Sequence, residues 1–122
     1  MTTSQLAFVG DSVLELHVKA YLAKNDRRSS KYLHNRMVRF TNAKSQAENV
    51  RVLMDKITQE EQELVLKGRN SNASQGRKTA TVMDYKYATG LEVLLGYLYF
   101  EQPKRLQEVL EIYMEIAIAH GS

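Results

Sequence analysis

Three carboxylates in apolar surroundings are the residues of this chain best suited to chemistry. Asp11 lies within the mainly apolar stretch Leu6–Leu16, and Glu15 follows it at a spacing of four residues, which puts both on one helix face. Glu92 is the sole charged residue between positions 91 and 100. An ionised carboxylate is rarely buried unless it is paired or binds a metal, because its desolvation is costly. The pattern therefore predicts that Asp11 and Glu92 meet across two packed helices and hold a divalent cation.

The expected cation is Mg²⁺, for which Mn²⁺ can substitute. Mg²⁺ takes oxygen ligands and usually keeps several waters, so one or two carboxylates are enough to bind it. A cation held in this way activates water and neutralises phosphate charge, which suits phosphodiester hydrolysis. In this hypothesis Asp11 and Glu92 are metal ligands and catalytic residues, and Glu15 orients a metal-bound water. Spacing alone leaves two other interpretations open: Asp11 and Glu15 could face solvent, and Glu92 could be a core carboxylate paired with Lys or Arg.

The basic residues are separated from the acidic ones along the chain. The net charge of +3, from 17 Lys and Arg against 14 Asp and Glu, is too small to identify a partner. However, positions 27–47 contain six Lys or Arg and no acid, and positions 67–78 contain four and no acid. Such segregation favours a polyanionic partner more than the net charge does.

The spacing of the apolar residues predicts an all-helical fold. Apolar residues recur every three or four positions, there is one Pro, and no strand-like alternation is sustained. Six helices are expected: about Ser4–Lys24, a second from Ser29 or Ser30, a third from Thr41–Asn42 through Ile57, a fourth capped by Thr58 and ending at Gly68, about Val82–Phe100, and about Lys104–His120. The pattern does not settle whether the second and third are separate helices or one bent rod.

Side-chain spacing also predicts which positions lie inside. On the first helix the expected buried residues are Leu6, Val9, Val13, Leu16, Val18, Tyr21 and Leu22. Gly10, Gly90 and Gly96 stand within helices, where glycine is costly, so we expect a neighbouring backbone to approach closely at each. The polar, basic segment Asn70–Thr79 is expected to be a mobile loop.

The bulk composition excludes several classes of protein. A length of 122 residues predicts one domain spanning 1–122. The absence of cysteine excludes disulfides, thiolate metal sites and a cysteine nucleophile. No apolar run approaches the ~20 residues of a membrane span, and no signal-peptide pattern is present, so a cytoplasmic location without membrane association is expected.

The two acidic stretches carry a resemblance to a known family. Leu6–Leu14, read as LAFVGDSVL, resembles the signature helix of the ribonuclease III catalytic domain, and Glu92–Tyr99, read as EVLLGYLY, resembles its second acidic helix. Their order and their separation of about 80 residues agree as well. The Gly68-Arg69-Asn70 entry into a polar loop and the following Tyr85–Glu92 stretch are similar to the short bacterial branch, Mini-ribonuclease III, which lacks a double-stranded-RNA-binding domain.

The resemblance implies the ribonuclease III endonuclease-domain fold, a homodimer, and Mg²⁺-dependent cleavage of double-stranded RNA to 5′-phosphate and 3′-hydroxyl ends. It further implies maturation of precursor 23S (large-subunit) ribosomal RNA. Asp11 and Glu92 match the family's metal-binding carboxylates, whereas Ser4, Ala7 and Thr89 stand where larger members carry acids. Without an accessory domain, the RNA must be held by this domain's own basic residues, for which the candidates are Arg36, Arg39, Lys67, Arg69, Arg77 and Lys78.

Two other functions remain open at this point. One is a non-catalytic RNA-binding protein that has the ribonuclease III-like fold but has lost too many acids to cut. The other is a helical protein-interaction or DNA-binding module whose acidic pair is incidental. The first predicts RNA binding without Mg²⁺-dependent cleavage, and the second predicts no preference for double-stranded RNA.

Overall fold

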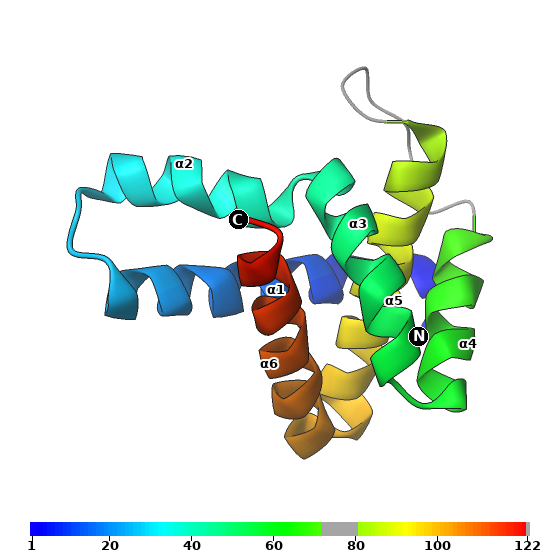
Figure 1. Cartoon of the computed structure of the whole chain (residues 1–122). Helices are drawn as coiled ribbons and strands as arrows, with labels where there is room; N and C mark the ends of the chain where they lie inside the picture. The colour runs from blue at the N-terminus through cyan, green and yellow to red at the C-terminus, as the bar shows by residue number, and fades with distance from the viewer. Residues whose placement is uncertain (72–80, 122) are drawn as a thin grey trace.

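The computed structural model describes residues 1–71 and 81–121, and these form helices without a strand. The order along the chain is α1 (Thr3–Asn25), α2 (Ser30–Thr41), α3 (Ala43–Leu53), the short 3₁₀ helix η1 (Met54–Lys56), α4 (Gln59–Arg69), α5 (Val82–Glu101) and α6 (Pro103–Ala119) (Figure 1). The six α-helices confirm the expected all-helical fold. The expected loop Asn70–Thr79 falls largely outside the described residues.

Side-chain caps fix most helix starts at the positions that the sequence predicts. The Thr58 hydroxyl accepts a hydrogen bond from the Glu61 N–H, and the Glu61 carboxylate accepts one from the Thr58 N–H, so the predicted capping box forms. Asn42 closes α2 through its backbone N–H and starts α3 through its side chain, which accepts from the Ser45 N–H. Since Asn42 is extended, with ψ of 154°, α2 and α3 are two separate helices.

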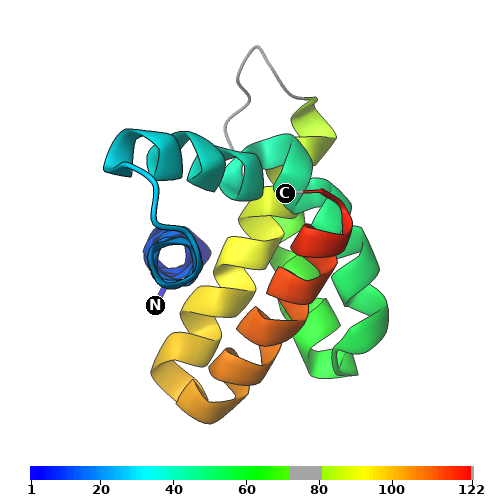
Figure 2. The same ribbon diagram turned by 60° about the vertical axis from the view of Figure 1, so that its left-hand side comes forward.

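Helix α5 is the central element of the fold. It packs against α1, α3, α4 and α6, whereas α2 extends alongside α1. Figure 2, in which α1 is seen end-on, shows α5 and α6 lying side by side with α2 above α1. The core around α5 includes the fully buried Leu94, Leu95 and Tyr113. No helix of the described residues is long and apolar enough to cross a membrane.

Glycines let the central helix approach two neighbours at backbone distance. A Cβ added at Gly10 of α1 would lie 1.7 Å from the Glu92 carbonyl oxygen, and one at Gly96 of α5 would lie 2.0 Å from the Leu6 carbonyl oxygen. A Cβ at Gly90 would lie 2.4 Å from the Val65 carbonyl oxygen of α4. The close approach predicted at Gly10, Gly90 and Gly96 is therefore confirmed.

The buried face of α1 differs from the expected one. The buried residues are Ala7, Gly10, Leu14, Val18 and Leu22. Leu16, expected inside, is 70% exposed, and Phe8 is 79% exposed. The prediction for Leu16 is wrong because α1 is apolar around most of its circumference, and the face that packs inward carries Ala7, Gly10 and Leu14 instead.

Candidate active site

Asp11 and Glu92 meet where α1 crosses α5. Gly10, the residue before Asp11, lies against the backbone of Glu92, so the two carboxyl-bearing positions are adjacent across the helix contact. The two carboxyl groups interact directly with each other. Asp11 is exposed and Glu92 is partly buried, so the pair is open to solvent from the Asp11 side.

The environment of Glu92 favours its protonated form. Burial, and then the charge of Asp11 and the hydrogen bond with it, raise the pKa of Glu92 to about 8. The Gln46 amide opposes this shift and favours the ionised carboxylate. Carboxylates that face each other at short distance cannot both ionise without a compensating positive charge. In the absence of a cation the pair therefore retains a proton near neutral pH.

Gln46 of α3 completes the surroundings of Glu92. Its side chain is almost fully buried, and its Nε2 is the one buried side-chain nitrogen or oxygen of the described residues that has no hydrogen-bond partner. One turn further along α3, the Asn49 amide donates to the Tyr113 hydroxyl, which donates to the Phe40 carbonyl. On the polar face of α3, the Asn49 amide is thus hydrogen-bonded, whereas the Gln46 amide nitrogen, next to the acidic pair, is not.

The donor set fits a hard divalent cation that keeps most of its waters. Two facing carboxylates are enough to bind Mg²⁺. The raised pKa of Glu92 beside Asp11 shows that positive charge between the two groups would be favourable. No group of three or more His, Cys, Asp or Glu side chains with metal-binding geometry occurs within residues 1–71 and 81–121. Ala7 and Thr89 are both buried, and the Thr89 hydroxyl donates to the Tyr85 carbonyl of its own helix.

Glu15 lies on the same helix as Asp11 but pairs elsewhere. Its carboxylate forms an ion pair with Lys19 at 2.8 Å, and both side chains are about half exposed. It joins no three-residue metal-binding group in the part of the chain that the structure describes. A role for Glu15 in orienting water therefore requires it to leave Lys19, and this role stays a prediction.

The six basic residues proposed for RNA contact have different surroundings. Arg36 is only 25% exposed and donates to Asp26 at 3.2 Å, so it ties α2 to the end of α1. Lys67 borders a groove whose other charged residues are mainly acidic: Glu60, Glu61, Glu63 and Arg105. Arg39 is exposed on α2. Arg77 and Lys78 lie outside the described residues.

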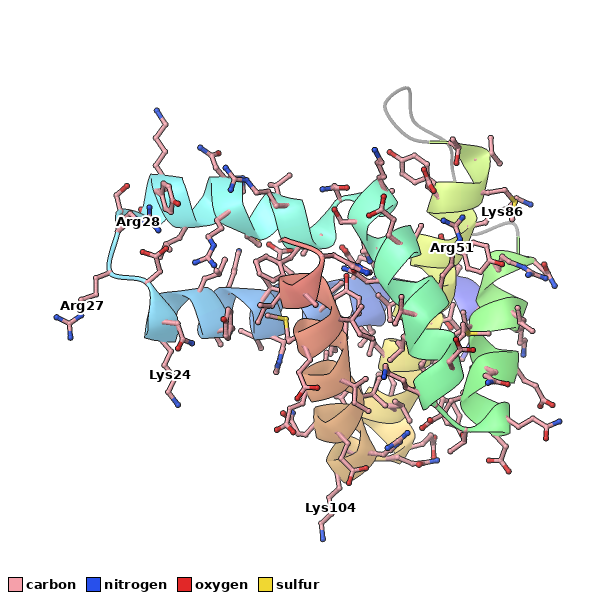
Figure 3. The ribbon with its side chains drawn as sticks, viewed as in Figure 1. Lys24, Arg27, Arg28, Arg51, Lys86 and Lys104 are labelled. Carbon is pink, nitrogen blue, oxygen red and sulfur yellow. The ribbon has the colours of Figure 1, made fainter. Side chains whose placement is uncertain are left out.

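Arg69 belongs to a cluster that sequence reasoning did not identify. It donates from Nη1 to the Tyr87 hydroxyl at 3.2 Å, with its guanidinium 5.5 Å from the Tyr87 ring centre. The Arg51 guanidinium lies 4.9 Å from the same ring centre and is 3.9 Å from Asp84. In Figure 3, Arg51 and Lys86 lie on the same side of the molecule. We call Arg51, Arg69 and Tyr87 the tyrosine–arginine cluster.

No local signal in the sequence identifies this cluster. Arg51 stands in an ordinary amphipathic helix, and its aromatic partner follows 36 positions later (87 − 51). The cation–π contacts hold two guanidinium groups in place on one aromatic ring.

Comparisons with known proteins agree on one family. The family model "Ribonuclease III domain" matches residues 4–103. The protein named Mini-ribonuclease 3 from Thermoanaerobacter sp. is 37% identical over 112 residues, which cover 91% of this chain and 79% of that protein. The Mini-ribonuclease 3 of Synechococcus sp. is 42% identical over 106 residues, covering 87% and 75%.

A solved structure shows the same fold. A crystal structure of a protein from Fusobacterium nucleatum superposes with a TM-score of 0.81 over 94% of this chain and 93% of its own, at 23% identity. The matched range 4–103 includes both Asp11 and Glu92. From the family model, the similar relatives and the shared fold, this chain belongs to the ribonuclease III family of double-strand-specific endoribonucleases, within its Mini-ribonuclease 3 branch.

Proposed function

We propose that this protein cleaves double-stranded RNA in a Mg²⁺-dependent reaction at the Asp11–Glu92 pair. The observation that carries the proposal is the contact between these two carboxyl groups across the α1–α5 crossing. Structural ion pairs between neighbouring helices join opposite charges, whereas this pair joins two acids. Such an arrangement is costly unless a cation compensates it.

Asp11 and Glu92 are the residues that would hold the cation, with Mn²⁺ as a substitute for Mg²⁺. When bound, the cation supplies an activated water and offsets charge on the scissile phosphate. The chain's own residues bring the two carboxylates together, because Gly10 lets α1 pack against the backbone of α5 at Glu92. Glu15, once released from Lys19, is placed one turn away to orient a water.

The tyrosine–arginine cluster is a second support for an RNA substrate. A-form RNA presents phosphates and 2′-hydroxyls rather than a readable major groove, so cations fixed on a surface are the expected contacts. Arg51 is about half exposed and interacts only weakly with Asp84 at 3.9 Å. Arg39, Lys67, Arg77 and Lys78 stay candidates, whereas Arg36 is engaged with Asp26 and is a weaker one.

The proposal includes a homodimer that acts on precursor 23S ribosomal RNA in the cytoplasm. Phe8 and Leu16, two turns apart on α1, are 79% and 70% exposed. Large apolar side chains that are exposed together mark a protein contact, and a second copy of the chain is the simplest partner. The relatives named Mini-ribonuclease 3 support cleavage of RNA.

Cleavage of a long double-stranded RNA with Mg²⁺ tests the proposal, with the Glu92→Gln variant beside the parent. The amide keeps the size of the side chain but removes the negative charge. We expect the parent to cut and the variant to bind RNA without cutting. If neither cuts but both bind, the domain is a non-catalytic RNA-binding protein. If neither binds, the assigned substrate is wrong.

A further inference from the structure

The buried amide of Gln46 is the part of the site that the two carboxylates leave unexplained. Gln46 is 4% exposed, and its Nε2 has no hydrogen-bond partner among the described residues. The other buried polar side chains of the described residues are all hydrogen-bonded: Asn49, Glu61 and Thr89. Folded proteins rarely leave a buried donor unsatisfied, and the Glu92 carboxyl on which Gln46 acts is the acceptor within reach, although their contact does not reach hydrogen-bond geometry in the metal-free state.

The backbone that carries Gln46 is held firmly. Gln46 lies in the first turn of α3, where the Asn42 side chain caps the Ser45 N–H and the Asn42 carbonyl accepts from the Gln46 N–H. One turn further, Asn49 bonds to Tyr113 of α6. The Gln46 amide is therefore carried by a well-anchored helix rather than by a loop.

Helix α3 packs directly on α5, the helix that carries Glu92. The Gln46 and Asp11 side chains both act on the Glu92 carboxyl. A cation bound by Asp11 and Glu92 would take the place of the contact between the two acids. The Glu92 carboxylate would then be free to turn towards the Gln46 donor.

We propose that Gln46 is a positioning residue for the cation site, which donates a hydrogen bond from Nε2 to the Glu92 carboxylate when that carboxylate binds Mg²⁺. The inference rests on the proposed function, because it assumes that Asp11 and Glu92 hold the cation. Hydrogen bonds to a ligating carboxylate fix its orientation and thereby raise metal affinity. Gln46 itself touches neither the cation nor the RNA in this arrangement.

A purely structural Gln46 predicts a different result. If the amide only fills space, an apolar side chain of similar length removes an unsatisfied donor and leaves the protein equally stable or more stable. Metal affinity would then not change. The two interpretations are separated by a binding measurement, which does not depend on catalysis.

The test is Mn²⁺ binding to the metal-free full chain, measured by titration calorimetry, for the parent, Gln46→Met and Glu92→Gln. We expect Gln46→Met to bind about 10–100-fold more weakly. We also expect it to bind double-stranded RNA like the parent and to regain cleavage at high Mg²⁺. The matched control is Gln62→Met, because the amide of Gln62 on α4 donates to the Met54 carbonyl of η1 and not to the site. This control should keep the parent's Mn²⁺ affinity.

The outcomes separate this inference from the proposed function. If Glu92→Gln loses Mn²⁺ while Gln46→Met binds as tightly as the parent, the role of Gln46 is overturned and the metal site stands. If the parent itself binds no Mn²⁺, both are overturned.

A second measurement covers the case in which Gln46→Met does not fold. The side-chain amide NMR signals of Gln46 in the parent should move on addition of Mg²⁺ and stay in place in Glu92→Gln. Signals that do not move in the folded parent, although the protein binds the cation, overturn the proposal.

Discussion

Gly10 of α1 lies so close to Glu92 of α5 that a Cβ at Gly10 would be 1.7 Å from the Glu92 carbonyl oxygen. Because Asp11 follows Gly10, the same contact that packs the two helices also brings the two carboxyl groups together. Assembly of the site and packing of the core are therefore one event in this fold.

The Gly10→Ala variant should be strongly destabilised. Its methyl group would meet backbone rather than a flexible side chain, so α1 must move away from α5. We expect a loss of more than about 3 kcal/mol of unfolding free energy and a fall in Tm of more than about 10 °C. Thermal denaturation measures both, with Ser4→Ala on the exposed side of α1 as a control of little effect. An unchanged Tm for Gly10→Ala would contradict the close approach.

The metal-free protein should lose stability as pH rises. The folded-state pKa of Glu92, about 8, is above its ordinary value of 4.5, so the folded state binds this proton more tightly. The resulting stabilisation is fully present below pH 4.5 and is lost as pH rises through about 8. Denaturant unfolding in the presence of a chelator measures this dependence.

The Glu92→Gln variant is the reference for that measurement. Burial lowers the pKa of His17 below 6.5, so the contribution of His17 to stability increases as pH rises towards 6.5. This effect is opposite in sign to that of Glu92. Since both proteins contain His17, the difference between them isolates Glu92. A difference that does not change with pH would show that the carboxyl titrates normally.

Replacement of one arginine of the tyrosine–arginine cluster should weaken RNA binding and reduce its dependence on salt concentration. Arg51→Gln or Arg69→Gln should reduce the slope of log K against log salt by about 1 if each contacts one phosphate. Binding of a short RNA duplex over a series of salt concentrations measures this slope. Lys104→Gln is the control, because Lys104 lies exposed at the far end of the molecule from Arg51 (Figure 3). An equal effect at Lys104 would indicate non-specific attraction only.

A charge on the exposed face of α1 should dissociate the proposed dimer. Leu16 is 70% exposed in the single chain, and Leu16→Glu would place a carboxylate in an apolar contact. Analytical ultracentrifugation should show the parent as a dimer and the variant as a folded monomer. Val38→Glu, at a side chain that is 43% exposed on α2, is the matched control. If the parent is already a monomer, the dimer is ruled out.

Most helix starts could be predicted because their causes are local, whereas the end of α3 at Leu53 rather than Ile57 was not. Asn42 and Thr58 cap helices through atoms within three residues, and a sequence displays such pairs directly. The inward face of α1 could not be predicted in the same way. When residues on most sides of a helix are apolar, the partner helix decides which face is buried, and here it selects the small Ala7 and Gly10 over Leu16.

The acidic pair could also be predicted, because carboxylates in apolar helices conflict with simple burial. Gln46 could not, since a neutral amide in an amphipathic helix is unremarkable until α3 is packed on α5. Arg51 was missed for a similar reason, as its ring partner Tyr87 belongs to another helix. Whether Asp11, Glu15 and Glu92 act in catalysis stays a prediction.

The position of α5 among four other helices limits how this protein can evolve. A helix with neighbours on nearly every side tolerates few new side chains, and glycines that touch backbone tolerate none. Adaptation to another RNA must then occur at the periphery, where α2 and the outer face of α4 have room for substitution. The innermost helix would change last, and its sequence should diverge most slowly among related genomes.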